Sequence, residues 1–243
     1  MRIRSVCALL AVCLLSACGE GSLFKTYEYE EDMYLSLDGT ATLYVNSSVA
    51  ALNALRGTTF DTAPSKAPDR ETLRTYFSSP GARVDRVTLS RRSSRRYVHV
   101  RIQVDNVETL PQAAPFNWST ISFKRDGDLF YYRQSVGAAA GREVGDVGWR
   151  GNELVAFRMH LPSKIAYHNA GPGNPHRGNI LAWEQSLADR LHGAPLALDA
   201  RMEAQSILYR TLALFGSMFV LVAVLFVALL WWVFRRGAKP AQV

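Results

Sequence analysis

The sequence predicts an α+β domain, with an antiparallel sheet and short helices on one face, followed by a C-terminal transmembrane helix. Segments of strand composition and short helical segments are segregated along the chain and do not alternate as βαβ units. Two Asp-Gly pairs, Asp38-Gly39 and Asp126-Gly127, stand between apolar segments and are typical of hairpin turns. The segment from Leu212 to Phe234 carries no charge.

The first half of the domain is expected to contain two hairpins separated by two short helices. Its strands are predicted at residues 27–37, 40–45, 83–90 and 97–104. Asn46 and Ser47 are expected to cap a helix that stops at Gly57. Asp69 is expected to cap a second helix that ends near Phe77. Residues 58–68 are predicted to be a loop.

The second half is expected to contain further strands and two long connections. A short helix is predicted near residues 107–114, and a third hairpin turns at Asp126-Gly127. The strands predicted here are 119–123, 129–136, 154–161, 164–168 and 179–187. Residues 137–151 form a connection rich in Gly and Ala, and residues 195–206 are expected to lead into the spanning helix.

The N-terminus has the composition of a lipoprotein signal. Arg2 and Arg4 precede an apolar run from Val6 to Leu15, and small residues follow. Leu15-Ser16-Ala17-Cys18 resembles the bacterial lipobox. That resemblance implies cleavage before Cys18 and lipidation of its thiol, with residues 1–17 as the signal peptide. The alternative is an ordinary signal peptide cleaved nearby, which would leave Cys18 as a plain residue.

The C-terminal segment is predicted to span a membrane. Its 23 uncharged residues would form a helix of about 35 Å, enough for a hydrocarbon core of about 30 Å. Arg210 precedes the segment, Arg235 and Arg236 follow it, and Trp231-Trp232 lie near one end, where indole rings prefer the headgroup layer. A soluble core helix rarely has an apolar surface on every side.

These two signals divide the chain and orient it. After the signal peptide we expect a lipidated N-terminus and linker (18–26), an extracytoplasmic domain (27–198), a juxtamembrane segment (199–210), a transmembrane helix (211–234) and a basic cytoplasmic tail (235–243). The positive-inside tendency favours a cytoplasmic C-terminus. The predicted location is therefore the bacterial cytoplasmic membrane, with a single pass.

Charge and cysteine content exclude several classes of function. The net charge is +7, but five basic residues flank the two apolar segments, and the rest of the chain has 23 basic against 21 acidic residues. Nucleic-acid binding is therefore not expected. All three cysteines lie within the first 18 residues. A mature chain that begins at Cys18 has no intramolecular disulfide, cysteine zinc site or downstream cysteine nucleophile.

The layout resembles the LppM-like family of bacterial membrane-anchored lipoproteins. The matching features are the Cys18 lipobox, the Leu37-Asp38-Gly39 turn, the Leu161-Pro162 step, the segment from Asn179 to Trp183 and the terminal helix. The resemblance implies an α+β domain that faces away from the cytoplasm, and a link to lipoglycan binding and cell-envelope function. It supplies no catalytic residue. The loops at 58–68 and 137–151 match no family motif, which leaves the ligand class open.

The chain contains no common catalytic motif, and we expect no enzyme activity, no metal and no cofactor. His168 and His176 flank the Gly-Pro-Gly-Asn-Pro loop and are interpreted as exposed loop residues. The acidic residues Glu28, Glu30, Glu31 and Asp32 are expected on a solvated strand face, because their spacing fits no calcium loop. The aromatic residues of the first and third hairpins are expected in the core or in cross-strand pairs.

The strongest local candidate for binding is a basic hairpin tip, formed by Arg91, Arg92, Arg95 and Arg96. Guanidinium groups there would contact anionic headgroups or an acidic glycolipid, and the alternative is a solvated turn. The first hypothesis is thus a non-enzymatic envelope protein that contacts lipid or glycolipid. The second is an envelope scaffold or assembly factor whose partner is another membrane protein.

Overall fold

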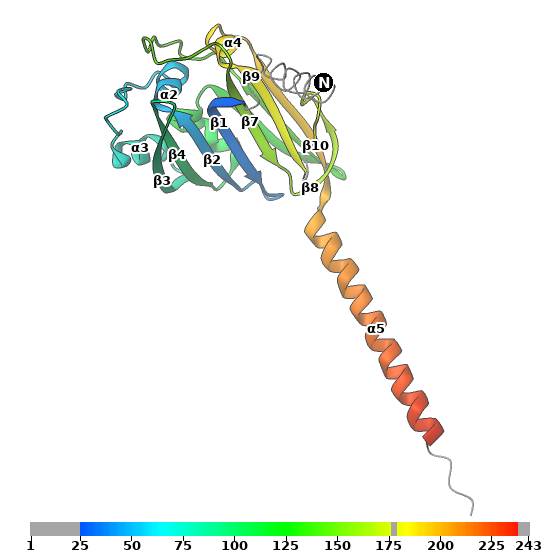
Figure 1. Cartoon of the computed structure of the whole chain (residues 1–243). Coiled ribbons are helices and arrows are strands. Elements are labelled where there is room, and N and C mark those ends of the chain that lie inside the picture. The colour runs from blue at the N-terminus through cyan, green and yellow to red at the C-terminus, as the bar shows by residue number, and fades with distance from the viewer. Residues whose placement is uncertain (1–24, 176–178, 238–243) are drawn as a thin grey trace, which may run out of the picture.

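The computed structural model describes residues 25–175 and 179–237. It contains two sheets that share one hydrophobic core, followed by a long C-terminal helix (Figure 1). This confirms the predicted α+β class with a terminal apolar helix, although two sheets replace the single sheet expected. The predicted signal peptide, Cys18 and His176 lie outside the described residues.

The first sheet has six strands in the order β3-β4-β2-β1-β7-β9. All neighbouring pairs are antiparallel except β1 and β7, which are parallel. The strands are β1 (Thr26–Leu35), β2 (Ala41–Ser48), β3 (Ala82–Arg92), β4 (Arg95–Val104), β7 (Glu153–His160) and β9 (Ile180–Ser186).

The second sheet has four antiparallel strands in the order β5-β6-β10-β8. They are β5 (Ser119–Asp126), β6 (Leu129–Val136), β10 (Leu196–Ser206) and β8 (Ser163–His168). Strand β10 corrects the sequence interpretation, since residues 195–206 were expected only to lead into the spanning helix. The predicted domain boundary at residue 198 therefore falls inside a strand, and the folded domain continues to Ser206.

Short helices lie at one end and along one side of the sheets (Figure 1). They are α2 (Val49–Arg56), α3 (Arg70–Phe77), α4 (Leu187–Leu191) and the 3-10 segments η1 (Val107–Gln112) and η2 (Ala114–Phe116). Ser48 caps α2, so the expected caps Asn46 and Ser47 are wrong because β2 continues through both. Asp69 caps α3 as predicted, and its side chain accepts from the Thr72 N–H.

The hydrophobic core lies between the sheets. Tyr29 and Val155 come from the first sheet and Tyr132 and Ala200 from the second, and each is fully buried. Trp118 packs edge-on against Tyr29, with ring centroids 5.7 Å apart. The expected core role of several strand aromatics is thus confirmed.

The strand directions define two ends of the domain, which differ in the turns and helices that they hold. Helix α5 (Ile207–Gly237) begins next to Pro162, whose carbonyl accepts from the Ile207 N–H. We call this the proximal end; the turns at 36–40 and 126–128 also lie there. The distal end holds the turn between β3 and β4, the start of α2 and the connection that enters β7. Strand β7 runs between the two ends for 8 residues, or about 26 Å.

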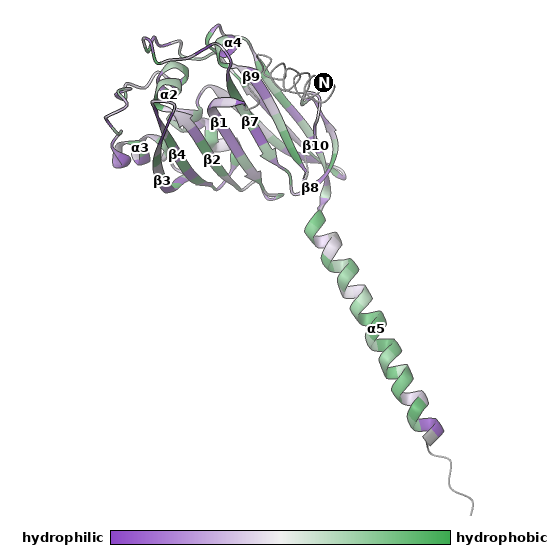
Figure 2. Cartoon of the chain, viewed as in Figure 1, coloured by the Kyte–Doolittle hydropathy of each residue, from purple (hydrophilic) through white to green (hydrophobic). Residues whose placement is uncertain are grey.

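Helix α5 is long and apolar enough to cross a membrane. Its candidate span covers Ile207–Arg236, and none of its most apolar window is buried against the domain. The helix is apolar along most of its length and ends in Arg235 and Arg236 (Figure 2). An exposed apolar surface of this length is stable in lipid and unfavourable in water.

Candidate functional site at the distal end

The four predicted arginines lie at the distal end, but they do not form one exposed tip. Ser93 and Ser94 make the turn, with Arg91 and Arg92 at the end of β3 and Arg95 and Arg96 at the start of β4. Arg91 and Arg92 are exposed and Arg96 is half-buried. Arg95 is only 9% exposed and points into the domain, so it does not share the exposed surface that the sequence suggested.

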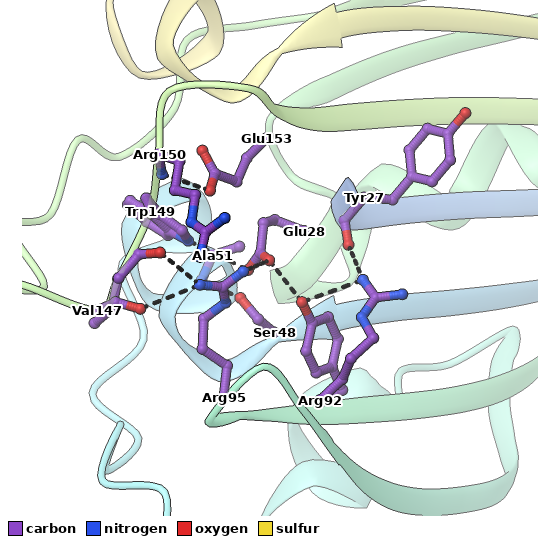
Figure 3. Close-up of polar contacts among 12 residues, drawn as sticks. Tyr27, Glu28, Ser48, Ala51, Arg92, Arg95, Val147, Trp149, Arg150 and Glu153 are labelled. Atoms are coloured by element: carbon purple, nitrogen blue, oxygen red, sulfur yellow. Dashed lines mark hydrogen bonds and ion pairs between the residues drawn. The ribbon is translucent and has the colours of Figure 1, made fainter. Parts of the chain in front are cut away.

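Arg95 is buried because it pairs with Glu28. Its Nη2 lies 2.8 Å from the Glu28 carboxylate, which is fully buried. The same carboxylate accepts from the Tyr97 hydroxyl at 2.6 Å and from the Trp149 indole at 3.3 Å (Figure 3). Three donors of this kind satisfy a charge that would otherwise be unstable away from water.

A β-bulge places Glu28 inside the domain. Tyr27 pairs with Leu154 and Tyr29 with Val155, so Glu28 is an extra residue on β1. Side chains along a regular strand alternate between the two faces of the sheet, and a bulge changes the direction of one of them. The prediction that the acidic residues of β1 form a solvated face is therefore wrong for Glu28, and also for Glu31, which is 4% exposed.

The other acidic residues of β1 are paired on the outer face of the six-stranded sheet. Glu30 forms an ion pair with Arg158, and Asp32 lies 2.9 Å from the His160 imidazole. Tyr34 stacks on the same imidazole with centroids 3.8 Å apart. These contacts explain the acidic run as a cross-strand network of β1 and β7.

The connection before β7 is tied to the hairpin through Arg95. The Arg95 Nη1 donates to the carbonyls of Val147 and Gly148, at 3.3 and 2.9 Å. Further along, the Glu153 carboxylate accepts from the N–H groups of Arg150 and Gly151 (Figure 3). Trp149 and Glu153 were not predicted as members of this site, although a lone tryptophan in a connection rich in Gly and Ala was a usable signal.

Two of the remaining arginines also have defined contacts. Arg92 lies over the Tyr97 ring at 4.8 Å and donates to the Tyr27 carbonyl at 3.1 Å. The Arg96 Nε donates to the Pro64 carbonyl at 2.9 Å. Arg96 therefore links the hairpin to the loop at 58–68.

A cavity of about 460 Å³ lies among these segments. The start of α2, the loop at 62–64, the β3–β4 turn and residues 146–148 enclose it. Its lining residues are Val49, Ala50, Thr62, Ala63, Pro64, Ser93, Ser94, Arg95, Arg96, Asp146, Val147 and Gly148. A volume of several hundred Å³ is typical of sites for small molecules.

The electrostatics keep Arg95 charged. Burial by itself lowers its pKa, but Tyr97 and the negative charge of Glu28 raise it, and the net pKa is raised. Burial, and then the hydrogen bond to Glu28, raise the pKa of Tyr97, so this phenol stays a donor at neutral pH.

The structure describes His168 but not His176, so it does not test a relation between them. Within residues 25–175 and 179–237, no group of three or more His, Cys, Asp or Glu side chains is arranged to hold a metal ion.

No family model matches the sequence. No curated protein matches it either. Among solved structures, the folded domain of LppM from Mycobacterium tuberculosis is similar, with a TM-score of 0.42 and 15% identity over 76% of this chain and 95% of that domain. The two folds are distantly similar, and membership of this chain in the LppM-like family stays a prediction.

Proposed function

We propose that this chain is a non-enzymatic envelope protein anchored by α5, whose extracytoplasmic domain contacts glycolipid or lipid through its distal end. The proposed location is the cytoplasmic membrane of a bacterium, with a cytoplasmic C-terminus and a lipid on Cys18. The observation that carries the proposal is that an unburied apolar helix is joined directly to β10 of a domain whose arginine hairpin lies at the opposite end.

The fold favours glycolipid over ordinary phospholipid as the contact. The distal end stands about 26 Å from the start of α5 along β7. With the domain upright, the exposed Arg91 and Arg92 are therefore remote from the headgroups around α5. A glycolipid whose polar part extends from the bilayer reaches them, and guanidinium groups bind its anionic oxygens by paired hydrogen bonds.

Site-specific photo-crosslinking in native membranes tests this function. A photoreactive amino acid replaces Arg91 at the distal end in one full-length variant and Asp126 at the proximal end in a control. We expect glycolipid adducts from position 91 and only phospholipid or no adducts from position 126. A single dominant protein adduct at position 91 would instead support the scaffold or assembly function, with another membrane protein as the partner.

A further inference from the structure

We propose that the distal cavity binds a small oxyanion and that its preferred group is a phosphate. This proposal rests on the proposed function, because it names the chemical group that the distal end recognises. Four features of the lining support it: the start of α2, an unpaired nitrogen of Arg95, the Ser93-Ser94 turn and Arg96.

The start of α2 forms part of the cavity wall. Val49 and Ala50 are the first two residues of α2 and both line the cavity. The first N–H groups of a helix have no partner inside the helix, and the Ser48 side chain caps the N–H of Ala51. The first turn contains no acidic residue, so the partial positive charge there is not neutralised from within the helix.

Arg95 supplies a second and independent indication of a ligand. Both of its terminal nitrogens have partners, in Glu28 and in the carbonyls of Val147 and Gly148. Its Nε, however, is buried without a hydrogen-bond partner among the described residues. The residue is 9% exposed and lines the cavity. A buried donor without an acceptor is unfavourable. The Nε itself has almost no exposed surface, so a ligand oxygen would satisfy it after a small shift of the side chain toward the cavity.

The β3–β4 turn adds donors in a constrained position. Ser93 and Ser94 have φ angles of 48° and 58°, in the left-handed region that side chains other than glycine adopt rarely. Both serines line the cavity, and each carries a hydroxyl group that can donate a hydrogen bond. Arg96 lies beside them, and its guanidinium has donors beyond the Nε that contacts Pro64.

One acidic side chain opposes an anion in this cavity. Asp146 lines it, and its carboxylate accepts from the Gly148 N–H at 2.9 Å. Its charge must weaken the affinity for an oxyanion, whereas Arg96 must strengthen it. The two residues therefore give opposite and testable effects on the same ligand. The cavity exceeds the size of free phosphate, so the phosphate is expected to belong to a larger molecule.

Calorimetric titration of inorganic phosphate into the full-length chain tests the site. The chain is held in nanodiscs of phosphatidylcholine, and chloride keeps the ionic strength constant. We expect phosphate to bind the unmodified chain, Arg96→Gln to weaken binding about tenfold, as removal of a charged hydrogen bond does, and Asp146→Asn to strengthen it severalfold. Arg86→Gln, at an exposed position of β3 outside the cavity lining, should leave the affinity unchanged.

Two results would overturn the site. One is no phosphate binding by the unmodified chain, and the other is equal binding by the Arg96→Gln, Asp146→Asn and Arg86→Gln variants.

A second arm of the experiment adds vesicles of phosphatidylglycerol or phosphatidylcholine. It shows whether the bound phosphate comes from a lipid headgroup or from free phosphate. If phosphate binds while photo-crosslinking yields only protein adducts, the anion site stands and the proposed glycolipid contact fails. If phosphate does not bind while photo-crosslinking yields glycolipid adducts, the anion site is rejected and the proposed glycolipid contact stands.

Discussion

At the scale of single residues, the distal site depends on a buried charge pair. Glu28 is fully buried, and Arg95 is the basic residue paired with it. Removing one member of a buried pair costs more than the pair contributes, because the remaining charge has lost its partner and cannot regain water. Arg95 thus has a structural role through its terminal nitrogens and a proposed binding role through its Nε.

We expect Arg95→Met to destabilise the domain by about 3–5 kcal/mol, because Glu28 would be left buried and unpaired. Urea unfolding of the full-length chain in detergent, followed by tryptophan fluorescence, measures the change. Arg91→Met is the matched control, since Arg91 is exposed and should change stability by no more than about 0.5 kcal/mol. The double variant Glu28→Gln with Arg95→Met should recover part of the loss. A single variant as stable as the control would contradict the buried pair.

Glu31 should make stability depend on pH. Burial raises its pKa to about 7, against the effects of Tyr29, Arg56 and Arg190, which lower it. Between the ordinary value of 4.5 and about 7, the folded state therefore holds a proton that the unfolded state has released. The contribution of Glu31 to the free energy of unfolding therefore falls as pH rises through this window, by roughly 3 kcal/mol in total.

The variant Glu31→Gln should remove this dependence and be more stable than the unmodified chain at pH 8. Thermal unfolding of both proteins from pH 4 to pH 8 measures it. Burial lowers the pKa of His99, whose effect on stability has the opposite sign, but His99 is common to both proteins. The difference between the two curves therefore isolates Glu31, and parallel curves would show that its carboxyl does not titrate in this range.

At the scale of elements, the β3–β4 turn contains residues that its backbone does not favour. Two-residue turns with positive φ at both positions usually contain Asn-Gly, because other residues lose about 1–2 kcal/mol in the left-handed region. Here Ser93 and Ser94 occupy both positions.

The double variant S93N/S94G, which places the favoured Asn-Gly pair in this turn, should stabilise the domain by about 1 kcal/mol. The midpoint of urea unfolding measures this effect. The same variant removes both hydroxyl groups from the cavity, so phosphate affinity should fall while stability rises. A variant that is less stable than the unmodified chain would show that the serine side chains stabilise the turn through contacts of their own.

Elements that depend on neighbouring residues could be predicted from the sequence. Elements that depend on pairing between distant segments could not. Asp69 and the two Asp-Gly turns determine their structures through neighbouring residues, and the helix cap and hairpins formed as expected. Strand β10 was missed because its pairing with β6 and β8 joins segments far apart in the chain. The burial of Glu28 was missed for a related reason, since its bulge exists only in the parallel pairing of β1 with β7.

At the scale of the whole molecule, the charges of the proximal end bear on how the domain stands on the membrane. Exposed aspartates stand on the turns of the proximal end, at Asp38, Asp126 and Asp128. Anionic headgroups around α5 would repel them and attract the neighbouring exposed Lys124 and Arg125, since basic residues near such a surface gain about 1 kcal/mol each. These charges nearly balance, so the direct connection of β10 to α5 is what favours an upright domain with its arginine hairpin outermost.

The lipid predicted on Cys18 sets a limit on that upright orientation. Thr26 begins β1 at the distal end, parallel to β7, and Cys18 precedes it by 8 residues. A chain of that length spans at most roughly 26–29 Å, which barely equals the length of the sheet. With both anchors in one bilayer, this reach is just enough for the domain to stay upright.

Fluorescence quenching by spin-labelled lipid headgroups distinguishes these orientations. Cysteine-linked fluorophores are placed at Ser94→Cys, at the distal end, or at Asp128→Cys, at the proximal end, in the full-length chain. In the Cys18→Ala variant, α5 alone retains the chain in the membrane. We then expect strong quenching at position 128 and little at position 94. With Cys18 lipidated, quenching at position 94 should stay low, because the chain from Cys18 to Thr26 can span the height of the upright domain. Strong quenching at position 94 in the lipidated chain would show that the second anchor draws the distal end to the headgroups, and phospholipid would then be within reach of the distal arginines. Equal quenching at the two positions in the Cys18→Ala background would mean that the domain lies flat without the lipid, and the distal arginines would then contact the bilayer directly.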